Sequence, residues 1–188
     1  MKKVLIIIGI IVLVLVGVGF LAFNSLNKEK VSISASTFNT TMENKGYIMT
    51  DTTSQFAQYE NYMKESYVAQ KTGYQIEFYE LSSVEHAISM YNTNKTKFES
   101  QKSNASASAT ASMNNYSTYS LTTNGKYKYL SRIDNTLVYV DVDESYKDIV
   151  KDIMKEIKIV KIEKKKILIG KEHILIIKLL QKKEKNSI

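Results

Sequence analysis

The sequence predicts an α+β protein, in which an N-terminal transmembrane helix precedes a mainly antiparallel sheet of about six strands with two longer helices on one face. Three observations predict this class. Twenty consecutive apolar residues lie near the N-terminus, several short segments alternate apolar and polar side chains, and two longer segments repeat apolar residues at helical spacing. At 188 residues the chain has room for one such domain, which we place at residues 31–157.

The apolar segment, residues 4–23, contains no charged or strongly polar side chain. As a helix rising 1.5 Å per residue it spans about 30 Å, the hydrocarbon thickness of a bilayer. We expect an uncleaved signal anchor that contacts the lipid bilayer. The alternative is a cleaved signal peptide, whose apolar stretch is usually about 7–15 residues and ends at a small-x-small site. The following sequence, FLAFNSLN, shows no clear site of that kind.

The charges on either side of this segment predict its orientation. Residues 1–3 carry two lysines and the amino terminus, whereas residues 28–30 carry a net charge of only +1. The positive-inside rule then places residues 1–3 in the cytoplasm as an n-region and everything after about residue 24 outside. The expected localisation is the cell membrane, with one pass and an extracytoplasmic C-terminal domain.

Alternation and turn residues predict six strands in the domain. They are expected at residues 47–53, 66–71, 74–81, 116–122, 126–133 and 136–142.

Three helices are expected as well, a short one at 36–45 and two longer ones. Ser82 and Glu85 have the spacing of a capping box and begin a helix that runs to about residue 100. Ser145 and Asp148 repeat this spacing before the last helix, which ends near residue 157.

Residues 101–115 differ in composition from both flanks, because Ser, Ala and Asn dominate and Met113 is the one large apolar side chain. Such a stretch buries too little apolar surface to offset its ordering entropy. We predict a mobile loop, with an Ala-rich extension of the preceding helix as the alternative.

The segments GYQIEFYEL, NTNKTKFE and SRIDNTLVYVDV resemble a family of small membrane-anchored exported domains of Firmicutes, which we know as uncharacterised. The resemblance covers about residues 31–157 and implies an exported α+β topology. Its motifs are strand and helix signatures, so it implies no active-site residues. Residues 158–188 depart from the family pattern.

The C-terminal tail, residues 158–188, is rich in Lys and Ile and strongly basic. Residues 151–188 hold twelve lysines and five acidic residues, whereas the rest of the chain is neutral. Three interpretations stay open: a surface segment on anionic lipid or wall polymer, a segment packed on the domain, or one without settled structure. Its apolar run is too short and too charged to span a bilayer.

Residue types exclude several kinds of site. With no Cys, the chain has no disulfide, Cys-ligated metal or cysteine nucleophile. With His86 and His173 as its two histidines, a His-rich metal site is not expected, and we interpret His86 as a solvated helix residue. We predict no catalytic, cofactor-binding or metal-binding residues and no cofactor.

The acidic residues that might form a site also fit structural roles. Glu77 and Glu80 are three positions apart on a predicted strand, so they should lie on opposite faces. Asp141, Asp143 and Glu144 could offer carboxylates to a cation, but the spacing of a calcium loop is missing. A strand end followed by a helix N-terminus, where acidic residues suit the dipole, is the preferred interpretation.

Tyrosine is enriched, with thirteen residues. Tyr127 and Tyr129 share one strand face and Lys126 and Lys128 the other, so the aromatic and basic groups are not presented together as a nucleic-acid surface requires. We expect half-buried tyrosines and no nucleic-acid partner.

The sequence therefore favours a non-catalytic, single-pass membrane protein whose outer domain binds an envelope protein or an anionic wall polymer. One alternative is an envelope hydrolase that uses carboxylates such as Asp51, Asp141 or Asp143. Another is a structural subunit of an envelope assembly, which would expose a large apolar patch on the sheet.

Overall fold

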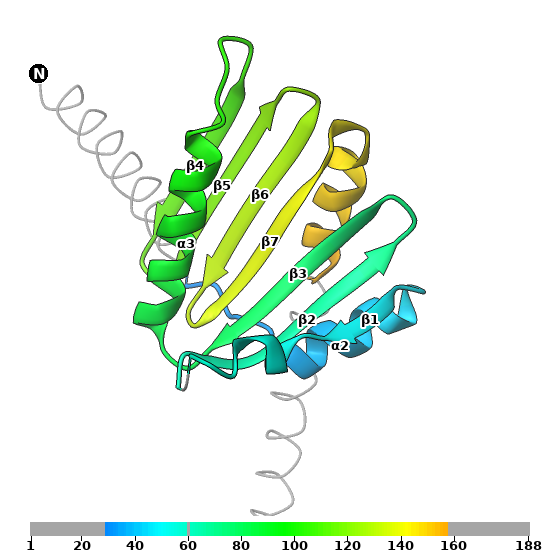
Figure 1. The fold of residues 1–188 in the computed structure, drawn as a ribbon, viewed down its shortest axis with the longest axis vertical. Helices are drawn as coiled ribbons and strands as arrows, with labels where there is room; N and C mark the ends of the chain where they lie inside the picture. The colour runs from blue at the N-terminus through cyan, green and yellow to red at the C-terminus, as the bar shows by residue number, and fades with distance from the viewer. Residues whose placement is uncertain (1–28, 60, 158–188) are drawn as a thin grey trace, which may run out of the picture.

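The computed structural model describes residues 29–59 and 61–157. Within them, seven strands form one antiparallel sheet in the order β1-β2-β3-β7-β6-β5-β4 (Figure 1). The α+β class is confirmed, with seven strands instead of about six. The strands are β1 (Ile48–Asp51), β2 (Met63–Lys71), β3 (Tyr74–Leu81), β4 (Ala107–Met113), β5 (Tyr116–Thr123), β6 (Lys126–Ile133) and β7 (Thr136–Asp143).

The helices are α2 (Ala35–Asn44), α3 (Val84–Glu99) and a last helix that the structure describes over residues 147–157. Two 3-10 turns complete the described part, Thr53–Phe56 between β1 and β2 and Glu144–Tyr146 after β7. All three predicted helices are therefore present, each close to its expected position.

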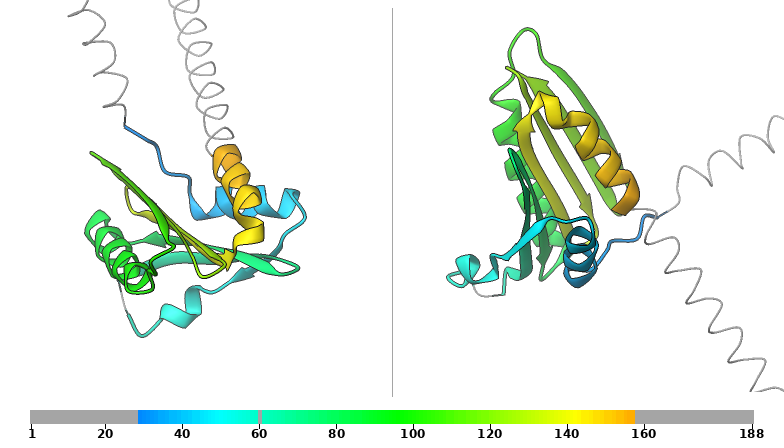
Figure 2. Two further views of the ribbon diagram at one scale, coloured as in Figure 1. Left: turned by 90° about the horizontal axis from the view of Figure 1, so that it is seen from above. Right: turned by 90° about the vertical axis from the view of Figure 1, so that its right-hand side faces the viewer.

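The helices divide between the two faces of the sheet (Figure 2). One face, the α3 face, packs against α3; the other, the α2 face, packs against α2 and the last helix. The core of the α3 face consists of Leu81, Ala87, Tyr91, Phe98, Tyr119, Leu121, Leu130 and Leu137. The core of the α2 face includes Phe38, Met42, Ile76, Phe78, Tyr127, Val138, Val140, Val142, Val150 and Ile153.

The prediction that both longer helices lie on one face is therefore wrong. A helical stripe of apolar residues shows that a helix buries one side, but not which face of a sheet it covers. The face that α3 covers depends on the chain connection. α3 follows β3, which lies inside the sheet, and crosses β7, β6 and β5 before the chain reaches β4 at the edge. The last helix follows β7 directly and packs on the opposite face, where Val138, Val140 and Val142 point.

The prediction of a loop at 101–115 is wrong over residues 107–113, which form β4. This strand pairs with β5 along its whole length, from Ala107 opposite Thr122 to Met113 opposite Tyr116. Ordering does not depend on apolar burial here, since the first six residues of β4 are exposed and backbone pairing holds the strand.

Both predicted capping positions shift. The N-cap of α3 is Ser83, one residue after the predicted Ser82, and its hydroxyl accepts a hydrogen bond from the His86 amide at 3.1 Å. Ser145 lies within the 3-10 turn that precedes the last helix.

Within the described residues, no helix combines the length and the apolar character that crossing a bilayer requires. The predicted n-region at 1–3, the predicted anchor at 4–23 and the basic tail at 158–188 lie outside the described residues.

Candidate functional site

The two aspartates of β7 form ion pairs with lysines of β6. Lys128 and Asp141 are direct cross-strand partners, and so are Lys126 and Asp143. The Lys128 side chain is only 5% exposed, it pairs with the Asp141 carboxylate, and its ammonium lies 5.0 Å from the centre of the Phe98 ring. The Lys126 ammonium lies 2.8 Å from Asp143, and this hydrogen bond raises the pKa of Lys126. Both carboxylates are therefore paired with lysine side chains of the neighbouring strand.

Asp51, the third candidate carboxylate, lies far from the other two. It is on β1, which β2 and β3 separate from β7. At about 4.8 Å between neighbouring strands, this places β1 about 14 Å from β7. The Thr53 amide and hydroxyl bond the Asp51 carboxylate and lower its pKa, with the amide donating at 2.8 Å. The structure does not bring the three aspartates together.

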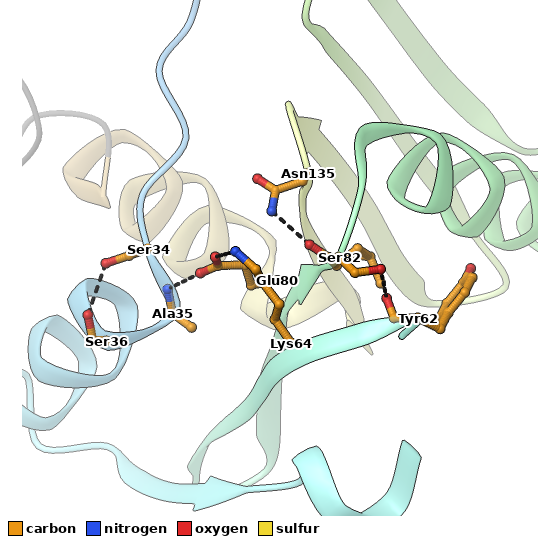
Figure 3. A network of polar contacts seen from close by, with 9 residues as sticks. Ser34, Ala35, Ser36, Tyr62, Lys64, Glu80, Ser82 and Asn135 are labelled. Carbon is orange, nitrogen blue, oxygen red and sulfur yellow. Dashed lines mark hydrogen bonds and ion pairs between the residues drawn. The ribbon is translucent and has the colours of Figure 1, made fainter. Parts of the chain in front are cut away.

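Glu77 and Glu80 lie on opposite faces of β3, as predicted. The Glu77 carboxylate accepts hydrogen bonds from the Tyr79 hydroxyl and from Gln75, whose amide nitrogen is 2.8 Å away. Glu80 lies between α2 and β2 (Figure 3). Its carboxylate accepts from the Ala35 amide at 3.1 Å and pairs with Lys64 at 3.4 Å. Glu80 thus joins the first turn of α2 to the sheet, at an end where a carboxylate suits the helix dipole.

His86 is half-buried beside Tyr62, and its Nδ1 atom lies 2.8 Å from the Ser82 hydroxyl. The Ser82 hydroxyl also contacts the backbone carbonyls of Asn61 and Tyr62, so it bonds the start of β2 to the start of α3 (Figure 3). Among the described residues, no ion pair links His86 to a carboxylate. His173 lies outside the described residues.

No group of three or more His, Cys, Asp or Glu in the described part of the chain could hold a metal ion. Tyr127 and Tyr129 are stacked with ring centres 6.4 Å apart and face away from Lys128, as predicted. Burial raises the pKa of Tyr127 to about 12. The two tyrosines pack against the α2-face core.

The feature that sequence reasoning missed is the outer edge of β4, which we call the β4 edge. β4 is the last strand of the sheet, and among the described residues nothing pairs with its outer side. Natural edge strands are usually short, charged, proline-containing or covered. β4 has seven residues, and residues 103–115 contain neither a charged side chain nor proline. Half of its backbone hydrogen-bonding groups therefore face outward, and the described residues give them no such protection.

The turn at one end of the β4 edge is held firmly. Buried Arg132 donates hydrogen bonds at 3.2 Å to the backbone carbonyls of Asn115 and Asp134. The Asn115 side chain accepts from the Lys30 amide at 3.1 Å and donates to the Lys30 carbonyl. The Lys30 ammonium lies 3.3 Å from the centre of the Tyr116 ring, on the α2 face. The first described residues of the domain are thus fixed beside the β4 edge.

The signal for this site in the sequence is the alternation of Ala with Ser or Thr in an uncharged segment. The low hydrophobicity of this segment led to the prediction of a loop. Its alternation with a period of two, however, is typical of a strand. Comparison of the chain with models of protein families, with curated proteins and with solved structures found no match. The resemblance to membrane-anchored domains of Firmicutes stays a prediction.

Proposed function

We propose that this chain is a non-catalytic, single-pass membrane protein that presents its α+β domain outside the cytoplasm as an interaction module of the cell envelope. The observation that carries the proposal is the β4 edge. An exposed, uncharged row of backbone donors and acceptors binds another extended segment by strand addition, without any catalytic group.

The two ends of the described domain support a membrane-facing α2 face. Lys30 lies on this face, where its ammonium group contacts the Tyr116 ring, and Ile157 packs into the core of the same face. The apolar residues 4–23 precede the first of these points, and the lysine-rich residues 158–188 follow the second. With the α2 face toward the bilayer, the anchor would reach the lipid directly and the tail would begin near anionic headgroups.

The environment of the candidate carboxylates supports a non-catalytic role. A carboxylate-based glycosidase needs two carboxyl groups about 5–10 Å apart, one of them able to hold a proton. Asp141 and Asp143 instead neutralise lysines, and Asp51 lies on a distant strand in a turn that lowers its pKa.

The topology is tested by cysteine labelling, which is clean because the chain has no native cysteine. Asn104→Cys is in an exposed part of the domain, and a cysteine inserted directly after Met1 lies in the predicted cytoplasmic n-region and keeps both of its lysines. We expect a membrane-impermeant maleimide to label Asn104→Cys on intact cells and the inserted cysteine only after lysis, with both proteins sedimenting with membranes. The reverse pattern, or release of the domain into the medium, would overturn the proposal.

The interaction edge is tested by photo-crosslinking in intact cells. A benzophenone amino acid replaces Ala109 in the middle of β4, and in a control it replaces Ile48 on β1, which is 70% exposed. We expect discrete crosslinked products from position 109 and far weaker ones from position 48. No product from position 109 would contradict an interaction module that uses the β4 edge.

A further inference from the structure

The sequence of β4 is nearly symmetric about Ala109. Reading outward from this residue, Ser108 matches Thr110, Ala107 matches Ala111 and Ser106 matches Ser112. In an antiparallel pair of two identical strands related by a two-fold axis through residue 109, each residue faces its symmetric counterpart. Alanine would then face alanine, and hydroxyl would face hydroxyl.

We infer that the β4 edge binds the β4 edge of a second copy of this chain, so that two seven-stranded sheets join into one. This inference rests on the proposed function, since it names the partner of the same edge. Cross-strand hydroxyl pairs already occur beside the edge, because the Ser112 and Ser117 hydroxyls lie 3.1 Å apart between β4 and β5. The joined sheet would repeat this kind of contact across the two-fold axis.

Charge favours a second copy at this edge. A two-fold axis places a charged side chain at or beside residue 109 close to its like-charged copy, which is destabilising across a strand pair. β4 and its flanks avoid this cost, because the nearest charged residue before the edge is Lys102 and the nearest after Met113 is Lys126. The opposite edge is unsuited to the same contact, since β1 has four residues and ends in Asp51.

The geometry also agrees with two copies in one membrane. Antiparallel edge pairing places the two-fold axis perpendicular to the sheet, so both copies keep the same face on the same side. Lys30 contacts Tyr116 on the α2 face, so both chains would leave toward the bilayer from one side. The two Met113 residues would lie about 26 Å apart along the paired strands. Anchoring then raises the effective concentration of a contact whose small side chains bury little apolar area.

Single-cysteine variants of the full chain in native membranes test the register. Ala109→Cys lies on the axis, so mild oxidation should give a disulfide-linked dimer on a non-reducing gel. Ser108→Cys and Thr110→Cys, carrying different tags and co-expressed, should link to each other. Each should link poorly to itself, because its own copies would be about 8 Å apart between Cα atoms, beyond disulfide reach. Ile48→Cys on β1 is the exposed control, and it should stay monomeric.

Ala109→Lys tests the contact without a crosslink, since it places like charges on the axis at an exposed position. We expect its thermal unfolding to match the wild type, and Ser108→Cys and Thr110→Cys in its background to lose at least nine-tenths of their mutual crosslink. Absence of the Ala109→Cys dimer, with benzophenone products to other proteins at the same position, would overturn self-pairing and leave the proposed interaction module intact. Absence of both kinds of product would overturn both.

Discussion

Lys128 is a charge held almost entirely inside the domain, and Asp141 is its counter-ion. Removing one partner of such a pair leaves an uncompensated buried charge, which is more costly than losing a surface ion pair. We predict that Asp141→Asn lowers the free energy of unfolding by about 3 kcal/mol. Asp143→Asn is the matched control, since both members of its pair with Lys126 are about half exposed, and it should change little. Urea unfolding measures both.

The same pair of variants bears on the hydrolase alternative. If Asp141 were a catalytic carboxylate kept at the expense of stability, Asp141→Asn would leave the free energy of unfolding unchanged or raise it. That outcome would contradict the structural role that its ion pair with Lys128 indicates.

Two buried tyrosine hydroxyls, those of Tyr91 and Tyr119, have no hydrogen-bond partner among the described residues. A buried polar group without a partner costs about 1–3 kcal/mol. We predict that Tyr91→Phe raises the free energy of unfolding by about 1 kcal/mol. The control is Tyr47→Phe, which removes a hydroxyl that lies 2.6 Å from the Tyr74 hydroxyl. In this variant the free energy of unfolding should fall. A loss of stability in Tyr91→Phe would contradict this prediction, because it would mean that the hydroxyl has a hydrogen-bond partner.

Tyr91 also links stability to alkaline pH. Burial raises the pKa of its phenol to about 12, whereas an unfolded tyrosine ionises near pH 10. Because the folded state holds the phenol proton more tightly, ionisation of Tyr91 does not lower the free energy of unfolding below pH 10. It lowers this free energy progressively as pH rises from 10 to 12. We predict that the wild-type domain loses stability across this window and that Tyr91→Phe loses less. Chemical unfolding at pH 9, 10, 11 and 12 tests this, and equal losses in both proteins would contradict it.

The elements that the sequence predicted well are those whose own residues alternate clearly between apolar and polar. The bounds predicted for β3, residues 74–81, match the structure, because Ile76, Phe78 and Leu81 contrast with polar neighbours and turn residues flank the strand. β4 was not predicted because its alternating Ala and Ser residues differ little in hydrophobicity. Backbone pairing with β5 stabilises this strand instead. A strand that is stabilised mainly by pairing with its neighbour has only a weak signal in its own sequence.

The face that each helix covers could not be predicted for a different reason. β7 is buried on both sides, with Leu137 toward α3 and Val138 toward α2. Its near-continuous apolar run fits a strand between two layers, yet it gives no rule for assigning a given helix to one layer. The strand order, with β7 inserted between β3 and β6, decides the assignment and is a long-range property.

The turn between β2 and β3 lies against Tyr146, in the 3-10 turn that precedes the last helix. Gly73 has φ of +88°, and a Cβ atom there would lie 2.1 Å from the Tyr146 hydroxyl oxygen. Gly125 has a similar φ of +70°, but open space surrounds it. We predict that Gly73→Ala costs about 2 kcal/mol and Gly125→Ala about 1 kcal/mol, both measured by thermal unfolding. Tyr146→Phe should recover part of the Gly73→Ala loss, and equal costs at the two glycines would contradict the close contact.

On the scale of the whole molecule, the sheet separates two cores among the described residues. α3 stabilises one of them, and α2 with the last helix stabilises the other. The side of the sheet toward α2 also receives Lys30 and Ile157, so the face proposed to lie toward the membrane and the contacts under α3 belong to different layers. Changes in one core should therefore affect the other weakly.

Double-mutant cycles test this separation. Phe38 and Phe78 stack on the α2 face with ring centres 4.7 Å apart, whereas Phe98 packs on the α3 face. Residues in contact couple by about 0.5–3 kcal/mol, and distant residues add to within about 0.5 kcal/mol. We predict that Phe38→Leu couples with Phe78→Leu and adds to Phe98→Leu, as measured by urea unfolding of the single and double variants. Strong coupling between Phe38 and Phe98 would contradict the separation of the two cores by the sheet.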